Sequence, residues 1–199
     1  MKRRPLPIKN IKTFEALIIF VVAHNDSMQH KHPSGMTKSE MVEKSIDTSL
    51  EGIKQSVHSK CFSFARIDFG ENVKITFWPE HASDSAIKNI YPTRIQNGAN
   101  VADALETASH IAEAFCNQQS EGGISHSSRI VLFTDGQDDD KVTTKQIIKG
   151  YKKTSKIWPL IFFLPSESNP KEGYDYCVSL GETEELYRAE QLSLFHSRT

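Results

Sequence analysis

The sequence has few cysteines, no early apolar run long enough to cross a membrane, and no excess of either charge. Its three cysteines, Cys61, Cys116 and Cys177, form no C-x-x-C pair, which argues against a zinc site and a disulfide framework and favours a reducing compartment. The apolar run from Ala16 to Ala23 is too short for a membrane span. It also lies too far from Met1 for a signal peptide. We therefore expect a cytoplasmic protein that makes no membrane contact.

The charge balance gives no general attraction for nucleic acid. Lysine and arginine total 24 against 25 aspartates and glutamates, so the formal net charge is -1. A protein that binds DNA or RNA through phosphates usually carries a basic surface. A local basic patch from Lys149, Lys152, Lys153 and Lys156 keeps nucleic-acid binding as an alternative, but we expect no nucleic-acid partner.

Motifs for nucleophilic or phosphate chemistry are missing as well. Ser27 is not part of a G-x-S-x-G elbow. The pair Gly122-Gly123 is followed by Ile124 and lacks the lysine of a phosphate-binding loop. We therefore predict that the protein is not an enzyme.

The chain length of 199 residues fits one domain with a sizeable core. Residues 1–14, rich in proline and basic side chains, are interpreted as a tail, and residues 15–199 as a single domain. A buried strand over residues 15–23 is followed by a polar loop over 24–35. Thr37 and Glu40 then form a capping-box pattern. Beyond it, apolar residues at helical spacing predict a helix: Val42, Ile46, Leu50, Ile53 and Val57.

Strands and helices are expected to alternate through the rest of the chain. Runs 61–69 and 73–78 flank a turn and predict a hairpin. Further patterns predict helices over residues 100–117, 143–153 and 182–190, and strands over residues 129–134, 157–164 and 174–180. Pro159 places its strand at an edge or a bulge. The alternation predicts an α/β three-layer sandwich, Rossmann-like, with a mostly parallel central sheet, one antiparallel edge strand, and helices on both faces.

Three motifs, in order, resemble the von Willebrand factor A (VWA) domain family. The run from Ala23 to Met28 resembles the family's first strand and its D-x-S-x-S-M loop. Residues 97–105 (NGANVADAL) resemble the G-G-T-N-I-x-x-A-L segment that leads into a helix. Thr134-Asp135-Gly136 resembles the T-D-G at the end of the central strand. The resemblance spans residues 15–190 and implies the VWA fold.

In that family the three loops form a metal-ion-dependent adhesion site (MIDAS), usually for magnesium, with one position left for a partner's carboxylate. Carried over residue by residue, the motif keeps Ser27 and Asp135, whereas Ala23, Asn25 and Ala99 replace an aspartate, a serine and a threonine. A hard dication prefers about six oxygen ligands with compensating negative charge. We therefore predict a degenerate MIDAS and no cofactor. The alternative is magnesium or manganese held by Asn25, Asp26, Ser27 and Asp135.

Two other polar stretches are candidate sites. His24, Asp26, His30 and His32 lie close in sequence, and imidazole suits zinc, copper or nickel, so a metal hydrolase centre is a further alternative. We prefer a polar loop without metal. The acidic run 138–140 is interpreted as a solvated loop in which Asp140 favours the start of the next helix.

The sequence thus predicts a non-enzymatic protein–protein interaction module, an adaptor or scaffold of the VWA type. Its contact surface is expected at the carboxyl edge of the sheet, over residues 23–35, 96–100 and 135–140. The candidate contact residues are His24, Asn25, Asp26, Ser27, Gly98, Ala99, Asn100, Asp135 and Gln137. As a bare domain, the chain is similar to stand-alone bacterial members associated with stress resistance or phage defence.

Overall fold

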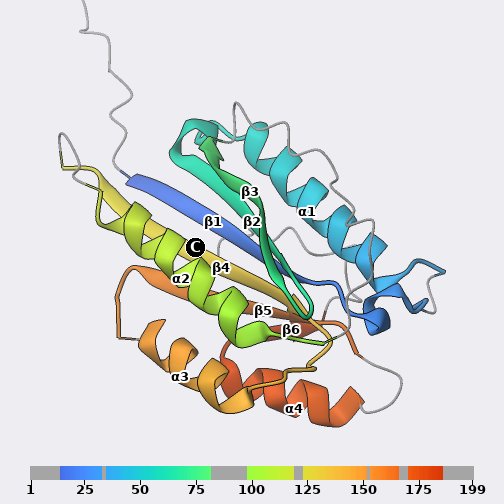
Figure 1. Ribbon diagram of the computed structural model, residues 1–199. Coiled ribbons are helices and arrows are strands. Elements are labelled where there is room, and N and C mark those ends of the chain that lie inside the picture. Colours follow the sequence, from blue (N-terminus) through green and yellow to red (C-terminus); the bar gives the residue numbers. More distant parts are fainter. Residues whose placement is uncertain are drawn as a thin grey trace, which may run out of the picture.

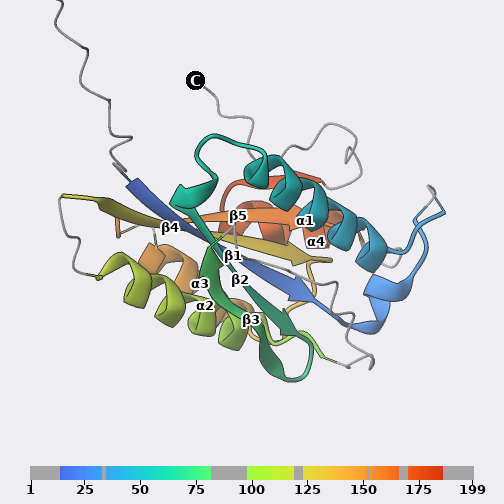
Figure 2. The same cartoon turned by 90° about the horizontal axis from the view of Figure 1, so that it is seen from above.

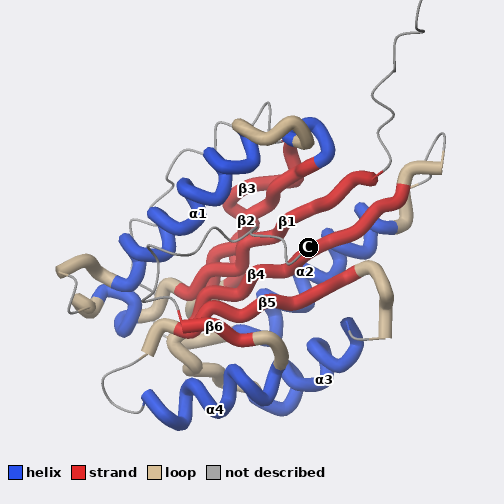
Figure 3. Tube along the Cα trace, turned by 180° about the vertical axis from the view of Figure 1, so that it is seen from behind, coloured by secondary structure: helices blue, strands red, loops and turns tan. Residues whose placement is uncertain are grey.

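A computed structural model describes residues 14–32, 35–81, 98–118, 123–151, 153–165 and 170–185 of the chain. Its centre is a six-stranded sheet in the order β3-β2-β1-β4-β5-β6, which Figure 3 shows from behind. The strands are β1 (Phe14–Ala23), β2 (Phe62–Phe69), β3 (Val73–His81), β4 (Ser125–Thr134), β5 (Ile157–Phe163) and β6 (Thr183–Glu185).

All neighbouring strands are parallel except β2 and β3, which form an antiparallel hairpin. Residues Leu17 to Ala23 of β1 are buried, and β1 lies between β2 and β4. A strand covered on both faces needs a continuous apolar run rather than an alternating one, and this is what the sequence of β1 provides. The expectation of a mostly parallel sheet with one antiparallel edge strand is confirmed.

In the described ranges, four α-helices accompany the sheet (Figure 1): α1 (Lys38–Lys54), α2 (Val101–Cys116), α3 (Lys141–Tyr151) and α4 (Pro170–Leu180). Helices α1 and α2 lie on opposite sides of the sheet (Figure 2), which confirms helices on both faces. Helix α1 begins at the expected capping box, with the Thr37 hydroxyl accepting from the Glu40 amide and the Glu40 carboxylate accepting from the Thr37 amide.

The side chains of β2 alternate between the two faces because successive residues of a strand point in opposite directions. Arg66 faces α1, where it contacts Glu43, and its neighbours Ala65 and Ile67 face the side of α2. Ile75 of β3, which pairs with Ile67, therefore lies on the side of α2.

Pro159 lies in the part of β5 that pairs only with β4, because β6 reaches only residues 161–163. Proline has no backbone N–H to donate to a second neighbouring strand. At residue 159, β5 is an edge strand, as predicted.

Four details of the predicted elements are corrected by the structure. Phe14 is the first residue of β1 rather than part of a tail. Val57 lies beyond α1 and is 93 % exposed. Residues 174–180 belong to helix α4, not to a strand, since Tyr176, Cys177 and Leu180 form a buried helical stripe. Residues 183–185 form β6 rather than the start of a helix, and the rest of that predicted helix lies outside the described residues.

Candidate functional site

The predicted contact loops meet at the carboxyl edge of the sheet, which we call the rim. Strands β1 and β4 are parallel neighbours and both end there, β1 at Ala23 and β4 at Thr134. They are also the strands between which the chain order of the sheet reverses. In open α/β sheets this switch point is where ligands bind. The loops after β1 and β4 therefore occupy the expected position for a binding site.

Four side chains from these two loops form a hydrogen-bonded group that we call the rim cluster: Asn25, Ser27, Asp135 and Gln137. The amide nitrogen Nδ2 of Asn25 donates to both carboxylate oxygens of Asp135 at 3.3 Å, and to Oε1 of Gln137 at 3.3 Å. The Ser27 hydroxyl donates to Oδ2 of Asp135 and lies 3.1 Å from Oδ1 of Asn25. The Gln137 backbone amide donates to Oδ1 of Asp135 at 3.1 Å. The single carboxylate is thus surrounded by donors of the chain itself.

A second buried group, the ionic cluster, lies beside it and consists of His24, Glu43, Arg66 and Asp68. Arg66 forms a two-pronged ion pair with Glu43 of α1 and donates from Nε to Oδ1 of Asp68 at 2.9 Å. The same oxygen is 2.6 Å from Nε2 of His24. All four side chains are at most 6 % exposed, so each charge depends on its partners rather than on water.

The pKa values of this cluster follow from those contacts. Burial alone would raise the pKa of Asp68, but the hydrogen bond from His24 and the charge of Arg66 outweigh burial and hold that pKa below its usual range. Burial would likewise lower the pKa of Arg66, and the bonds to Glu43 and Asp68 raise it instead. The Asp68 carboxylate and the Arg66 guanidinium therefore remain charged in the folded protein at neutral pH.

The third predicted loop spans residues 96–100. Residues 96 and 97 lie outside the described residues, and residues 98–100 are held by backbone contacts. The Ala99 amide donates to Oδ2 of Asp139 at 2.7 Å, and the Asp139 amide donates back to the Ala99 carbonyl at 3.1 Å. The Asn100 amide donates to the Gly70 carbonyl in the β2–β3 turn at 2.9 Å. The Ala99 side chain is buried and offers no oxygen. This loop ties the rim to the hairpin.

Glycines allow the rim to pack closely against α4. Gly136 has a φ of +83°, and a β-carbon there would lie 2.6 Å from the α-carbon of Gly173 in the first turn of α4. Only glycine adopts this conformation without strain, and a β-carbon at residue 136 would collide with the backbone of Gly173. The backbone that follows Asp135 is thereby fixed against α4.

The acidic run 138–140 is not simply solvated, which corrects its interpretation from the sequence. The hydroxyl of Tyr176 donates to the Asp138 carboxylate, and Asp139 bonds to Ala99 as described. Asp140 accepts from the Thr143 amide at 3.0 Å at the start of α3, so its predicted role at the helix start is confirmed. Hydrogen bonds with Thr143 lower the pKa of Asp140.

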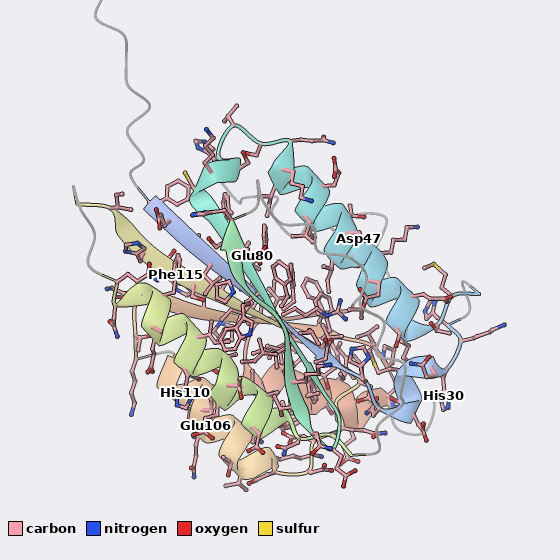
Figure 4. The ribbon with its side chains drawn as sticks, turned by 45° about the horizontal axis from the view of Figure 1, so that its top comes forward. His30, Asp47, Glu80, Glu106, His110 and Phe115 are labelled. Carbon is pink, nitrogen blue, oxygen red and sulfur yellow. The ribbon has the colours of Figure 1, made fainter. Side chains whose placement is uncertain are left out.

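The histidine-rich loop does not assemble into a metal centre. His24 points to Asp68, whereas His30 is exposed in the following turn, as Figure 4 shows for His30. Within the described ranges, no three histidine, cysteine, aspartate or glutamate side chains gather as potential metal ligands.

The predicted contact residues divide into a floor and a surface. Asn25, Ser27, Asp135 and, next to them, His24 and Ala99 are buried. Asp26, Gly98 and Gln137 are exposed, and Asn100 is half-buried. Asp26, which the alternative hypothesis assigned to a metal, is therefore exposed while the other three proposed ligands are buried together.

The ionic cluster is not among the residues predicted from the sequence, although the sequence contains a signal for it. Arg66 and Asp68 are charged residues two positions apart in an otherwise apolar strand, so they share one face. Charges at such positions are almost never buried without partners. Their partners come from residues 24 and 43, and only the fold reveals that pairing.

An open α/β sheet with a polar cluster at its switch point defines a class of ligand- and partner-binding domains. No protein-family model matches this sequence, and no curated protein matches it. Solved structures do, and they show that the chain has the VWA fold.

Three of these structures illustrate the similarity. The VWA domain of SpRpn10 is 13% identical, with a TM-score of 0.60, over 86% of this chain and 87% of that one. An aerotolerance-related membrane protein from Bacteroides fragilis is 16% identical, with a TM-score of 0.62, over 88% and 95%. Proximal thread matrix protein 1 from mussel byssus, with a zinc-occupied MIDAS motif, is 14% identical, with a TM-score of 0.62, over 92% and 44%. In the part of this chain that the structure describes, no helix is both long and apolar enough to cross a bilayer.

Proposed function

We propose that this protein is a non-enzymatic interaction module that binds another protein through the rim and does so without a metal ion. The observation that carries the proposal is the rim cluster, in which donors from the chain itself surround the carboxylate of Asp135. Asn25 presents its amide nitrogen to Asp135, and a nitrogen donor repels a cation. Mg²⁺ favours oxygen ligands in an octahedral array, usually with one or two carboxylates. One carboxylate alone would suit such an ion, but the Asn25 amide nitrogen and the Ser27 hydroxyl already donate to Asp135 and fit that demand poorly.

Recognition then depends on the exposed rim residues. Asp26, Gly98 and Gln137 face solvent above the buried floor, and the two polar side chains offer a carboxylate and an amide. A partner with amide or cationic donors complements these groups by direct hydrogen bonds. The three cysteines are free, and two of them are buried, which supports the proposed cytoplasmic location.

Calorimetric titration with MgCl₂ tests the metal part of the proposal. The chelator-treated protein is expected to give no binding isotherm. The positive control is a variant that restores the VWA motif, Ala23→Asp/Asn25→Ser/Ala99→Thr, which is expected to bind Mg²⁺. Millimolar or tighter binding by the unaltered protein, lost in Asp135→Ala, would instead support the magnesium or manganese alternative.

Partner capture from the native host tests the interaction part. Bait protein with Asp26→Arg/Gln137→Glu is compared with unaltered bait and with a matched surface control, Glu51→Arg/Gln55→Glu at the carboxyl end of α1. A partner retained by the unaltered and control baits, lost from the rim variant and insensitive to EDTA is the expected result. Loss of the partner in EDTA would show a metal-dependent contact. The hydrolase alternative is removed if elemental analysis of the purified protein finds no transition metal.

A further inference from the structure

A second surface, away from the rim, has the features of a docking site. A groove of about 430 Å³ runs between the edge strand β3 and helix α2. Its apolar lining comes from Ile75, Trp78 and Pro79 on β3 and from Ile111, Ala114 and Phe115 on α2. Figure 4 places Phe115 near the carboxyl end of α2, the end away from the rim loop at Ala99. The groove is therefore distinct from the rim cluster.

The groove exposes an unusually large apolar side chain. Trp78 is 63 % exposed, although tryptophan is buried to a large extent in most folded proteins. Tryptophan is also among the residues that dominate binding energy at protein interfaces. Its neighbours Ile75 and Ile111 are partly buried and pack against the core, so core contacts hold the base of the groove in place.

The edge of β3 is unsuited to binding a further strand. The pairing with β2 shifts register twice, between Phe64 and Ile67, and such bulges interrupt the regular row of backbone groups. Pro79 removes one backbone donor from the same stretch. Bulges and proline protect edge strands from pairing with other chains. Side chains rather than backbone are thus the binding elements here.

The charge beside the groove is negative. Helix α2 carries Asp103, Glu106 and Glu113, all exposed, and contains no lysine or arginine. Glu106 and Glu113 lie four positions before and three after His110, which lines the groove, so all three share one side of the helix. Figure 4 shows Glu106 and His110 on neighbouring turns of α2.

We infer that this groove binds a basic amphipathic helix of another protein. Apolar side chains of that helix fill the space beside Trp78 and Ile111, and its lysines or arginines face the acids of α2. Helices that dock in this way place an apolar face in a groove and keep charges at its border. The inference is independent of the rim and of any metal there.

The test uses a synthetic, fluorophore-labelled helical peptide with leucines on one face and lysines on the other, and a matched peptide with glutamates in place of the lysines. Binding is followed by fluorescence anisotropy at about 0.15 M salt, where long-range attraction is largely screened. The lysine peptide is expected to bind, and the glutamate peptide is expected to bind at least about tenfold more weakly because the acids of α2 repel it.

The decisive variant is Ala114→Glu, an exposed helix position in the groove. It makes the surface more acidic, so attraction by charge alone would tighten binding of the lysine peptide. Occupation of the groove instead predicts a loss of about tenfold or more. Val142→Glu on α3 is the matched control, since Val142 is 68 % exposed, and it is expected to leave binding unchanged.

Trp78→Ala is the second variant, with Trp158→Ala as its control because Trp158 is also exposed, at 48 %. Only Trp78→Ala is expected to weaken binding. The inference is wrong if Ala114→Glu binds the lysine peptide as tightly as the unaltered protein or if both peptides bind equally. It is also wrong if sedimentation reveals a dimer that Trp78→Ala dissociates, because a second copy of this chain then fills the groove.

Discussion

The rim cluster and the ionic cluster begin at adjacent residues, Asn25 and His24, and are closed in different ways. In the ionic cluster, a guanidinium pairs with two carboxylates, one of which also contacts the ring of His24. The rim cluster surrounds one carboxylate with neutral donors. A buried ion pair is costly to break because the remaining charge is left without a partner. The donors around Asp135 are neutral, so they are also able to hydrogen-bond a neutral acceptor at that position. The ionic cluster should therefore be the rigid support, and the rim cluster the tolerant one.

The largest effect is expected from Arg66→Met. This change leaves Glu43 and Asp68 buried without their cation and should lower the free energy of unfolding by about 3–5 kcal/mol. Urea denaturation at neutral pH measures the loss. Arg129→Met is the control, because the Arg129–Glu182 pair is long, at 3.9 Å, and largely exposed, and should cost under about 1 kcal/mol. Equal losses in the two variants would contradict the comparison.

A somewhat smaller effect is expected from Gly136→Ala beside the rim cluster. The positive φ causes backbone strain, and the close approach to Gly173 causes overpacking. Together they should lower the free energy of unfolding by about 3 kcal/mol. Gly35→Ala separates the two causes, because Gly35 has a φ of +87° but nothing within 4 Å of a new β-carbon. It should lose only about 1 kcal/mol. Thermal unfolding of both variants provides the measurement.

Asp135→Asn should be milder again, at about 2 kcal/mol, because charge-assisted hydrogen bonds are replaced by neutral ones. The loss should be the same in MgCl₂ and in EDTA. The measurement compares the denaturation midpoints of the unaltered protein and of Asp135→Asn in the two solutions. A loss seen only with magnesium would mean that an ion, rather than Asn25 and Ser27, stabilises the carboxylate.

The smallest effect concerns pH. The folded-state pKa of Asp68 is depressed, so its contribution to stability is present above the unfolded pKa of about 3.9 and is lost as pH falls through the folded value. The stability difference between the unaltered protein and Asp68→Asn should therefore be constant near neutrality and shrink below about pH 4. Urea titrations at several pH values measure it. A difference that grows in acid would contradict this sign.

The comparison also shows what the sequence is able to predict. Apolar patterning predicts β1, β2 and helices α1 and α2, because each buries one continuous stripe or run. Residues 174–185 were assigned wrongly, since short segments with mixed periodicity are decided by tertiary contacts such as that between Gly136 and Gly173. The position of the site, at the carboxyl edge where β1 and β4 end, is predicted from the loops. The partners of Arg66 were not, because Glu43 and His24 lie on other elements.

The central position of β1 has a consequence for how the molecule is made. Its neighbours β2 and β4 are encoded well after it, and β4 ends about 110 residues beyond the end of β1. At roughly 5–20 residues per second, β4 is synthesised several seconds after β1. During that time β1, the most apolar strand, lacks one of its two neighbours. Nascent chains of this protein should consequently depend on chaperones until β4 has emerged.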